Sequence, residues 1–254
     1  QPVKVLALRD RSTPTVRRVS VAAGGVLEVA VLHAADARGA QEGGADRVYA
    51  VAPSPDGWLS PDLPTASAII RAVEVPVWVQ LRLNDSLTTT GGEFSRLIGL
   101  GEEFVALGAA GLCFGFLDHD LEIDRATCTA LADALPEIPW MFHRGFDQTL
   151  DLGRAWRQVS TLPGLVGVMS AGSPSGSERG LDELLGHAAN PAIARWLVAT
   201  GGLTPEQVPW LARAGVRQFQ IDLQARPTGS LKAYVDSGLV RTWRDLIDSQ
   251  PTSG

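Results

Sequence analysis

The segment WMFHRGFD, residues 140–147, begins as an apolar run and ends with His143, Arg144 and Asp147. An imidazole titrates near neutrality and can act as a general acid or base, and a guanidinium binds carboxylates and phosphates through paired hydrogen bonds. Asp147 could instead cap the helix that the following DQTLDLGRAW predicts. Three interpretations are therefore open for this segment: a packed polar corner, a catalytic rim or a ligand-binding rim.

Charged residues within or at the end of other apolar runs form a second group of candidates. Glu28 lies inside VLEVAVL, where a carboxylate removed from water either pairs with a cation or keeps its proton at a raised pKa. Its candidate partners are Arg82, at the end of VPVWVQLR, and Arg144. A structural salt bridge and a catalytic role are both open for Glu28. We take Glu28, Arg82 and His143 as the candidate catalytic residues.

Further polar residues follow the remaining apolar runs. Asp118 lies in an acidic turn, Ser170 ends LVGVMS, and Gly201 and Gly202 belong to TGGLTPEQ. A glycine-bearing loop that leads into a helix N-terminus is how barrel proteins hold phosphate after their seventh strand. The histidines show no metal-ligand spacing, so the pattern predicts no metal site. The candidate ligand-binding residues are Arg144, Asp147, Asp118, Ser170, Gly201 and Gly202.

Short apolar runs rich in Val, Ile, Leu and Phe carry these residues, and a longer segment with helical spacing follows each run. The runs are residues 26–32, 47–51, 75–82, 110–116, 138–144, 165–170, 194–200 and 217–223. Strict alternation of strand and helix implies parallel strands. Eight repeats favour a single (β/α)8 TIM-like barrel of the α/β class over a doubly wound sheet, which would show a G-x-G-x-x-G turn after its first strand. In a barrel the strand ends that carry the candidates meet at one mouth.

Local signals place two of the helices. SPDLPTASAIIRAV predicts a helix with Ser60 as its N-cap and Pro61 at the first helical position, where a missing N–H is tolerated. TPEQVPWLARAG predicts a helix that is capped by Thr204 and ended by Gly215. The small-residue tract AGSPSGSERG, residues 171–180, predicts a mobile loop.

Composition excludes several classes of protein. The formal net charge is −6 and no Lys/Arg cluster forms a basic footprint, so nucleic acid is not expected as a partner. No apolar run approaches the roughly 18 residues that would span a membrane. Two cysteines in 254 residues suit neither a disulfide framework nor a four-thiolate zinc site, which favours a reducing compartment. We expect residues 26–250 to form one barrel domain after an N-terminal arm of uncertain structure at residues 1–25.

Several short motifs occur along the chain in a recognisable order. They are LEVAV, GADRV, GWLSPD, GFLDHDLEID, FHRGFD, SAG and GLTPEQ, and they extend from about residue 26 to 223. The Phe-His-Arg-x-Phe-Asp motif that ends the fifth run is the most specific of them. Together they resemble the copper homeostasis protein CutC family. The resemblance implies a TIM-like barrel, self-association into a homo-oligomer, and a cytoplasmic role described as copper handling through Cu(I) binding.

The chain departs from this family where copper would be bound. The resemblance places two adjacent cysteines at positions that hold Ala30 and Val31 here. Neither side chain can bind Cu(I), which selects thiolate and thioether ligands, so copper is implied as a cofactor by resemblance only. The polar rim residues of the family are kept, and they are Glu28, Arg82, His143, Arg144 and Asp147.

Three functions remain open on this basis. The first is copper homeostasis through metal binding, as the resemblance implies. The second is an enzyme that acts on a small anionic metabolite, with two arginines fixing a carboxylate or phosphate and with His143 or Glu28 moving a proton. The third is a noncatalytic barrel that binds a protein partner.

Overall fold

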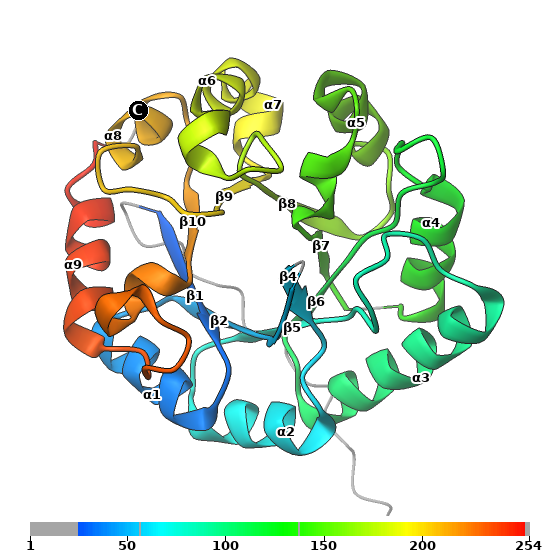
Figure 1. Ribbon diagram of the computed structural model, residues 1–254, viewed down its shortest axis with the longest axis horizontal. Coiled ribbons are helices and arrows are strands. Elements are labelled where there is room, and N and C mark those ends of the chain that lie inside the picture. The colour runs from blue at the N-terminus through cyan, green and yellow to red at the C-terminus, as the bar shows by residue number, and fades with distance from the viewer. Residues whose placement is uncertain (1–24, 56, 137, 252–254) are drawn as a thin grey trace, which may run out of the picture.

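The chain folds as a closed barrel of parallel strands, seen end-on in Figure 1. This computed structural model describes residues 25–55, 57–136 and 138–251. The barrel strands are β1 (Val26–Val31), β2 (Arg47–Ala50), β5 (Val77–Gln80), β6 (Gly111–Phe114), β7 (Trp140–Phe142), β8 (Leu165–Ser170), β9 (Leu197–Ala199) and β10 (Gln218–Ile221). Around the ring they follow the order β1-β10-β9-β8-β7-β6-β5-β2. Each predicted run contains one of these strands, and the predicted (β/α)8 barrel is confirmed.

Helices surround the barrel as an outer ring (Figure 1). In the described residues they are α1 (Ala34–Gly43), α2 (Leu63–Ala72), α3 (Gly91–Leu107), α4 (Arg125–Ala134), α5 (Leu152–Val159), α6 (Ser177–Ala188), α7 (Pro191–Ala194), α8 (Val208–Arg213) and α9 (Ser237–Asp248). A helix follows each barrel strand before the next one begins. All the strands therefore run in the same direction, and their carboxyl ends share one end of the barrel.

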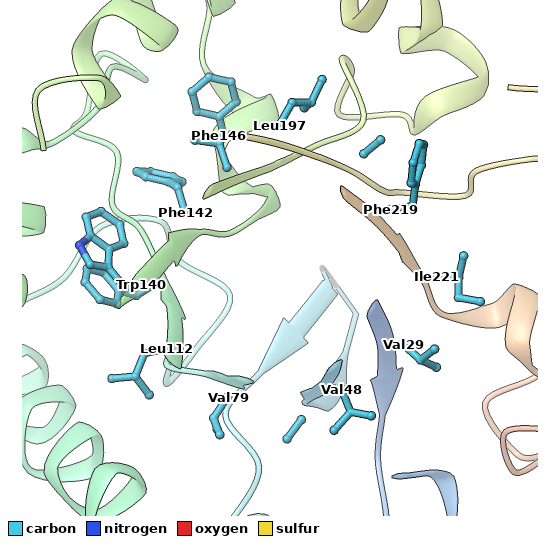
Figure 2. Close-up of a cluster of buried hydrophobic side chains, with 14 of the residues drawn as sticks. Val29, Val48, Val79, Leu112, Trp140, Phe142, Phe146, Leu197, Phe219 and Ile221 are labelled. Carbon is cyan, nitrogen blue, oxygen red and sulfur yellow. The ribbon is translucent and has the colours of Figure 1, made fainter. Parts of the chain in front are cut away.

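Side chains that alternate along each strand form two layers of core. On β1, Leu27, Val29 and Val31 belong to the layer between strands and helices, whereas Ala30 belongs to the layer inside the barrel. Figure 2 shows the outer layer, in which side chains such as Phe219 point away from the barrel axis. The inner layer contains Ala30, Leu32, Tyr49, Val51, Trp78, Cys113, Met141, Met169 and Val198.

An antiparallel hairpin that the sequence analysis did not predict follows β2. Its strands are β3 (Ala52–Ser54) and β4 (Gly57–Leu59). These strands are short and Pro53 lies in the first of them, so the apolar alternation that signals a strand is missing. The hairpin carries Trp58 over the barrel, where its side chain packs against the inner core layer.

The helix that follows the hairpin begins later than predicted. α2 starts at Leu63 with Asp62 as its N-cap, and the Asp62 carboxylate accepts the Thr65 N–H at 2.7 Å. Ser60, the predicted cap, instead accepts the backbone N–H of Arg82 through its hydroxyl oxygen at 2.8 Å. Ser60 is therefore tied to the end of a barrel strand and is not available as a cap.

The helix after β9 is also shorter than predicted. α8 begins at Val208, and Thr204 does not cap it. Gln207 is drawn toward α6, because its Oε1 accepts both the Thr204 N–H at 3.1 Å and the Ser177 hydroxyl proton at 3.0 Å. Residues 177–180, predicted as part of a mobile loop, form the first turn of α6.

The described chain enters the barrel directly, since Gly25 immediately precedes β1. Residues 1–24 of the predicted arm lie outside the described residues. Within the described part, no helix combines the length and the apolar character that crossing a bilayer requires.

Candidate functional site

A polar cavity of about 530 Å³ opens at the carboxyl ends of the barrel strands. The charged residues in its wall are Arg82, Asp85, Arg144 and Asp222. Its neutral polar residues include Gln80, His143, Thr200 and Gln220, and its apolar residues include Trp58, Leu87 and Met169. The candidates Arg82, His143 and Arg144 are thus brought together from the ends of β5 and β7, as closure of the barrel requires.

Asp147 supports Arg144 from behind the cavity wall. It lies in the 3-10 helix η1 (Arg144–Gln148) and is only 1% exposed. Its Oδ2 accepts the Arg144 Nε–H at 3.1 Å and the Ala171 N–H at 2.9 Å. Its Oδ1 accepts the hydroxyl proton of Ser170 at 2.6 Å. The carboxylate therefore fixes the orientation of the guanidinium group and does not itself line the cavity.

Ser170 also lies behind the wall. Its oxygen accepts the Gly172 N–H at 3.0 Å while its hydroxyl donates to Asp147. Burial raises the pKa of the Asp147 carboxyl, and the Arg144 charge and the Ser170 hydroxyl oppose this effect. The alternative that Asp147 caps a helix is wrong, because Asp151 is the N-cap of α5. In this structure both Asp147 and Ser170 position Arg144.

The two glycines of the predicted phosphate loop lie outside the cavity wall. A Cβ atom at Gly201 would lie 2.9 Å from Arg144 Cζ and 2.7 Å from Ala171 Cβ, and the φ of Gly201 is 76°. Only glycine fits there, because a side chain would collide with the guanidinium group and strain the backbone. Gly202 has a φ of 85° and faces open space. Since α8 starts only at Val208, its N-terminus does not continue directly from these glycines.

Backbone carbonyls hold both arginines of the wall. Arg144 Nη2 donates to the carbonyl oxygens of Ser173 and Pro174 at 3.2 Å each. Arg82 Nη2 donates to the carbonyl oxygen of Asp85 at 2.5 Å. Because these bonds fix the guanidinium planes in advance, less side-chain entropy is lost when a ligand binds.

His143 contributes a buried, neutral ring to the wall and is 5% exposed. Its Nδ1 accepts the Gly145 N–H at 2.9 Å, which places the proton of the neutral ring on Nε2. Burial and, next in size, the positive charge of Arg82 lower the pKa of His143 from 6.5 to about 3. The prediction that this imidazole titrates near neutrality is therefore wrong. At neutral pH the ring serves as a hydrogen-bond donor.

Glu28 lies away from the mouth and from its predicted partners. It is fully buried in the barrel interior, and its Oε2 accepts the Arg47 Nε–H at 2.6 Å. Arg47 is the first residue of β2, so the pair lies toward the amino ends of the strands. Burial raises the pKa of Glu28, and the Arg47 charge opposes this. The predicted pairing with Arg82 or Arg144 is wrong, and the geometry is that of a structural salt bridge.

The acidic residues in the described cavity wall are Asp85 and Asp222, whereas Asp118 does not line it. The Asp118 Oδ1 accepts the N–H groups of Asp120 at 2.9 Å and Glu122 at 3.0 Å, which closes a tight turn. Asp222 directly follows β10 and was missed as a ligand-binding candidate. Its place near the carboxyl end of the eighth predicted run, residues 217–223, was the signal that could have found it.

Known proteins share this fold, and some of them share part of this sequence. The CutC family matches the chain over residues 26–224. The chain belongs to the CutC family. It is 29% identical over 197 residues to a CutC family protein of Klebsiella pneumoniae, covering 76% of this chain and 78% of that protein. It is 30% identical over 201 residues to the human copper homeostasis protein cutC homolog, and the match covers 76% of this chain and 71% of the human protein. The crystal structure of a CutC protein from Streptococcus agalactiae matches with a TM-score of 0.69 at 20% identity, covering 77% of this chain and 97% of that one.

Within this CutC protein, the positions that the resemblance assigns to a cysteine pair do not form a metal site. Ala30 lies in the core inside the barrel, whereas Val31 lies in the core between strands and helices. Adjacent residues of a strand face opposite sides of the sheet, so these two positions do not converge on one point. Neither carries a donor atom for Cu(I).

Three other sulfur-bearing side chains lie together in the core inside the barrel. Cys113 and Met141 are neighbours on β6 and β7, and Met169 shares their core layer. However, Arg47 Nη2 donates to Met141 Sδ at 3.5 Å, which puts a fixed positive charge beside the sulfur. Burial also raises the pKa of the Cys113 thiol well above its ordinary range. These residues do not fit a Cu(I) site, and the described residues contain no cluster of three His, Cys, Asp or Glu side chains suited to a metal ion.

Proposed function

We propose that this CutC protein binds a small carboxylate-bearing metabolite at the barrel mouth, with Arg82 and Arg144 as the groups that receive the carboxylate. The observation that carries the proposal is that both guanidinium groups line one cavity and are already held by backbone carbonyls. Arg144 has an additional anchor in the Asp147 carboxylate. Because the Nε and Nη2 groups of Arg144 are committed to Asp147 and to two carbonyls, Nη1 is the nitrogen through which this guanidinium would donate to the ligand carboxylate.

Ligand binding accounts for the site better than proton transfer by the residues first considered for it. Glu28 is occupied by Arg47 and lies outside the cavity wall. His143, with a pKa of about 3, is neutral at neutral pH, so it lacks the proton that an imidazolium acid would donate. A hydrogen bond between the ring and the Gly115 backbone helps to hold the imidazole in the cavity wall.

The family assignment and the cysteines suggest where this function operates. Relatives of this chain are named copper homeostasis proteins, and both cysteines here are free and buried. Free thiols persist in a reducing compartment, which supports a cytoplasmic location. The homo-oligomer that the resemblance implies stays a prediction. The residues of this chain do not fit Cu(I). We therefore propose that it contributes to copper homeostasis through the metabolite bound at the barrel mouth, and not by binding copper itself.

Replacing either arginine with glutamine should weaken ligand binding strongly. A charge-assisted hydrogen bond contributes about 1.5–3 kcal/mol, so we expect Arg82→Gln or Arg144→Gln to raise the Kd about 10-fold to 100-fold. Thermal shift would first screen small organic acids, with and without an amino group, and inorganic phosphate. Calorimetry would then give the Kd of each hit for the wild-type protein and both variants.

Arg154→Gln provides the matched control for these variants. Arg154 also carries a guanidinium group, but it lies on α5 outside the cavity wall and its side chain is 54% exposed. Its loss should leave the Kd unchanged. The proposal would be wrong if no organic acid bound the wild-type protein at millimolar concentration, or if Arg82→Gln and Arg144→Gln both bound like the Arg154→Gln control.

Titration with Cu(I) should show no stoichiometric uptake by the reduced protein. The expected result in competition with a Cu(I) chelator is weak, nonsaturating transfer, and it should be the same for wild type and Cys113→Ser because that thiol does not act as a ligand. Binding of one equivalent that withstands the chelator, and that is lost in Cys113→Ser, would contradict this expectation and restore metal binding as the function.

A further inference from the structure

Asp222 gives the cavity an acidic side that a simple anion site would not have. It follows β10 and is half-buried in the cavity wall. Its Oδ1 accepts the Leu223 N–H at 2.5 Å, the Asp222 backbone also contributes a hydrogen bond, and within the described residues no side chain donates to this carboxylate. Burial raises the pKa of this carboxyl. A carboxylate in this position is stabilised when a cation comes to it.

The two described cations that act on Asp222, Arg144 and Arg226, are both committed to other partners. Arg226 lies near Asp222, but it is committed to Asp36, with an Nη2 to Oδ2 distance of 2.7 Å. Arg144 also acts on Asp222 through its charge, yet its Nε–H donates to Asp147 and its Nη2 to two carbonyls. The Asp222 carboxylate is therefore only partly compensated by the protein.

Among the described residues of the wall, positive and negative charges are equal in number. Arg82 and Arg144 contribute two positive charges, and Asp85 and Asp222 contribute two negative ones. Asp85 is turned to the hairpin, where its Oδ1 accepts the Ser54 hydroxyl proton at 2.6 Å. A multiply charged anion such as phosphate would leave Asp222 in repulsion, whereas a ligand with one positive and one negative group would match both sides.

Backbone geometry after β10 also argues against phosphate. A phosphate site at this end of a barrel needs bare N–H groups. Here the Asp222 N–H donates to Gln224 Oε1 at 3.0 Å, and the Leu223 N–H donates to Asp222 itself. The protein's own side chains thus occupy the donors that a phosphate would use.

We infer that the ligand is a small zwitterion of the amino-acid class, whose carboxylate meets Arg82 and Arg144 and whose ammonium group meets the Asp222 carboxylate. This inference rests on the proposed function, because it names the class of metabolite that the same cavity binds. The volume of about 530 Å³ lies within the range for small-molecule sites. Trp58, Leu87 and Met169 provide apolar wall for the carbon skeleton of such a ligand.

Matched pairs of ligands test the inference by calorimetry. The pairs are L-leucine with 4-methylpentanoate, L-glutamate with glutarate, and 4-aminobutanoate with butanoate, with inorganic phosphate as a separate probe. For at least one pair we expect the amino acid to bind the wild-type protein at least about 10-fold more tightly than its deaminated partner, as one charge-assisted hydrogen bond gives. Asp222→Asn should remove this preference, because the amide carries no charge, while the deaminated acid should bind as well as before or better.

Two further variants separate a binding role of Asp222 from a structural one. Asp222→Ser keeps an acceptor oxygen near the Leu223 N–H and should lose the preference in the same way, with folding checked by circular dichroism. Asp245→Asn removes an equal charge at an exposed position of α9 and should keep the preference. Equal binding of both members of every pair, tighter binding of phosphate, or an unchanged preference in both Asp222 variants would overturn the inference while the proposed function stands. Failure of every acid to bind would overturn both.

Discussion

Replacing His143 with asparagine is expected to remove much of the acid sensitivity of folding between pH 6.5 and pH 3. Burial, followed by the Arg82 charge, lowers the pKa of this ring from 6.5 in the unfolded chain to about 3 in the folded protein. Between these values the unfolded chain holds a proton that the folded protein does not. Unfolding is therefore favoured by each step down in pH, and the stabilisation present above pH 6.5 is lost as the pH falls toward 3.

The expected size of this effect is large for a single side chain. A pKa lowered from 6.5 to about 3 corresponds to about 5 kcal/mol between the ends of the pH window. Asparagine is the appropriate replacement, because its Oδ1 can accept the Gly145 N–H as Nδ1 does and it does not titrate. Urea denaturation at several pH values from 7 to 4 would measure the free energy of unfolding of both proteins.

The difference between the two pH profiles isolates the histidine. Glu28, Asp147 and Asp222 have raised pKa values, so their contributions to stability change with the opposite sign, but both proteins share them. For each pH unit below 6.5, we expect the free energy of unfolding of the wild-type protein to fall by about 1.4 kcal/mol relative to His143→Asn, because the unfolded chain binds nearly one more proton than the folded protein. Parallel profiles would show that the ring titrates normally and is exposed to water.

Breaking the interior salt bridge between Glu28 and Arg47 should strongly destabilise the barrel. Glu28→Ala leaves the Arg47 guanidinium buried beside Met141 and Trp78, and the Gln218 amide oxygen is then its one oxygen partner among the described residues. Removing one member of a buried ion pair costs about 3–5 kcal/mol, because the remaining charge stays desolvated. Chemical denaturation at pH 7 would measure the loss.

A double variant distinguishes an unpaired charge from a simple loss of volume. In Glu28→Leu/Arg47→Met both charges are gone and apolar groups fill the space, so most of the stability should return. The exposed pair Arg154–Glu122, with side chains 54% and 32% exposed, is the control, and Arg154→Ala should cost less than about 1 kcal/mol. If Glu28→Ala cost no more than that control, the pair would not have the structural role assigned to it.

Binary patterning was sufficient to predict the barrel. Each strand carries an apolar run, because both of its faces are covered, and a helix with its own periodicity follows. The hairpin of β3 and β4 was not predicted, because strands of three residues are too short to show an alternation of apolar and polar residues. The helix starts were misplaced for a different reason: Ser60 and Gln207 bond to distant segments, and such contacts are not visible in local sequence.

The candidate site was predicted in part for a similar reason. Alternation along a strand tells which face a side chain takes, and it puts Glu28 on the same face of β1 as Ala30, inside the barrel. It does not tell the height along the barrel axis, which is why Glu28 was paired with mouth arginines when its partner is Arg47. The pKa of His143 depends on burial and on Arg82, and these follow only from the assembled mouth.

The sequence also does not tell which residues line the cavity and which hold the lining residues in place. Asp147, Ser170 and Gly201 all act on Arg144, but their types alone are equally suited to ligand contact. Conversely, Asp222 reaches the cavity because of the turn that follows β10. A carboxylate near a supposed phosphate loop was therefore undervalued.

The central claim is that a carboxylate-bearing ligand binds at the barrel mouth, and the nitrogen resonances of His143 test it most directly. The chain has four histidines, and His143 is recognised in a 15N-histidine-labelled sample as the ring that stays neutral between pH 7 and pH 5 and is missing in His143→Asn. The claim predicts that the His143 resonances shift saturably with added ligand, and that the shift is lost in Arg144→Gln. Saturable binding that leaves these resonances unmoved would place the ligand elsewhere and contradict the claim.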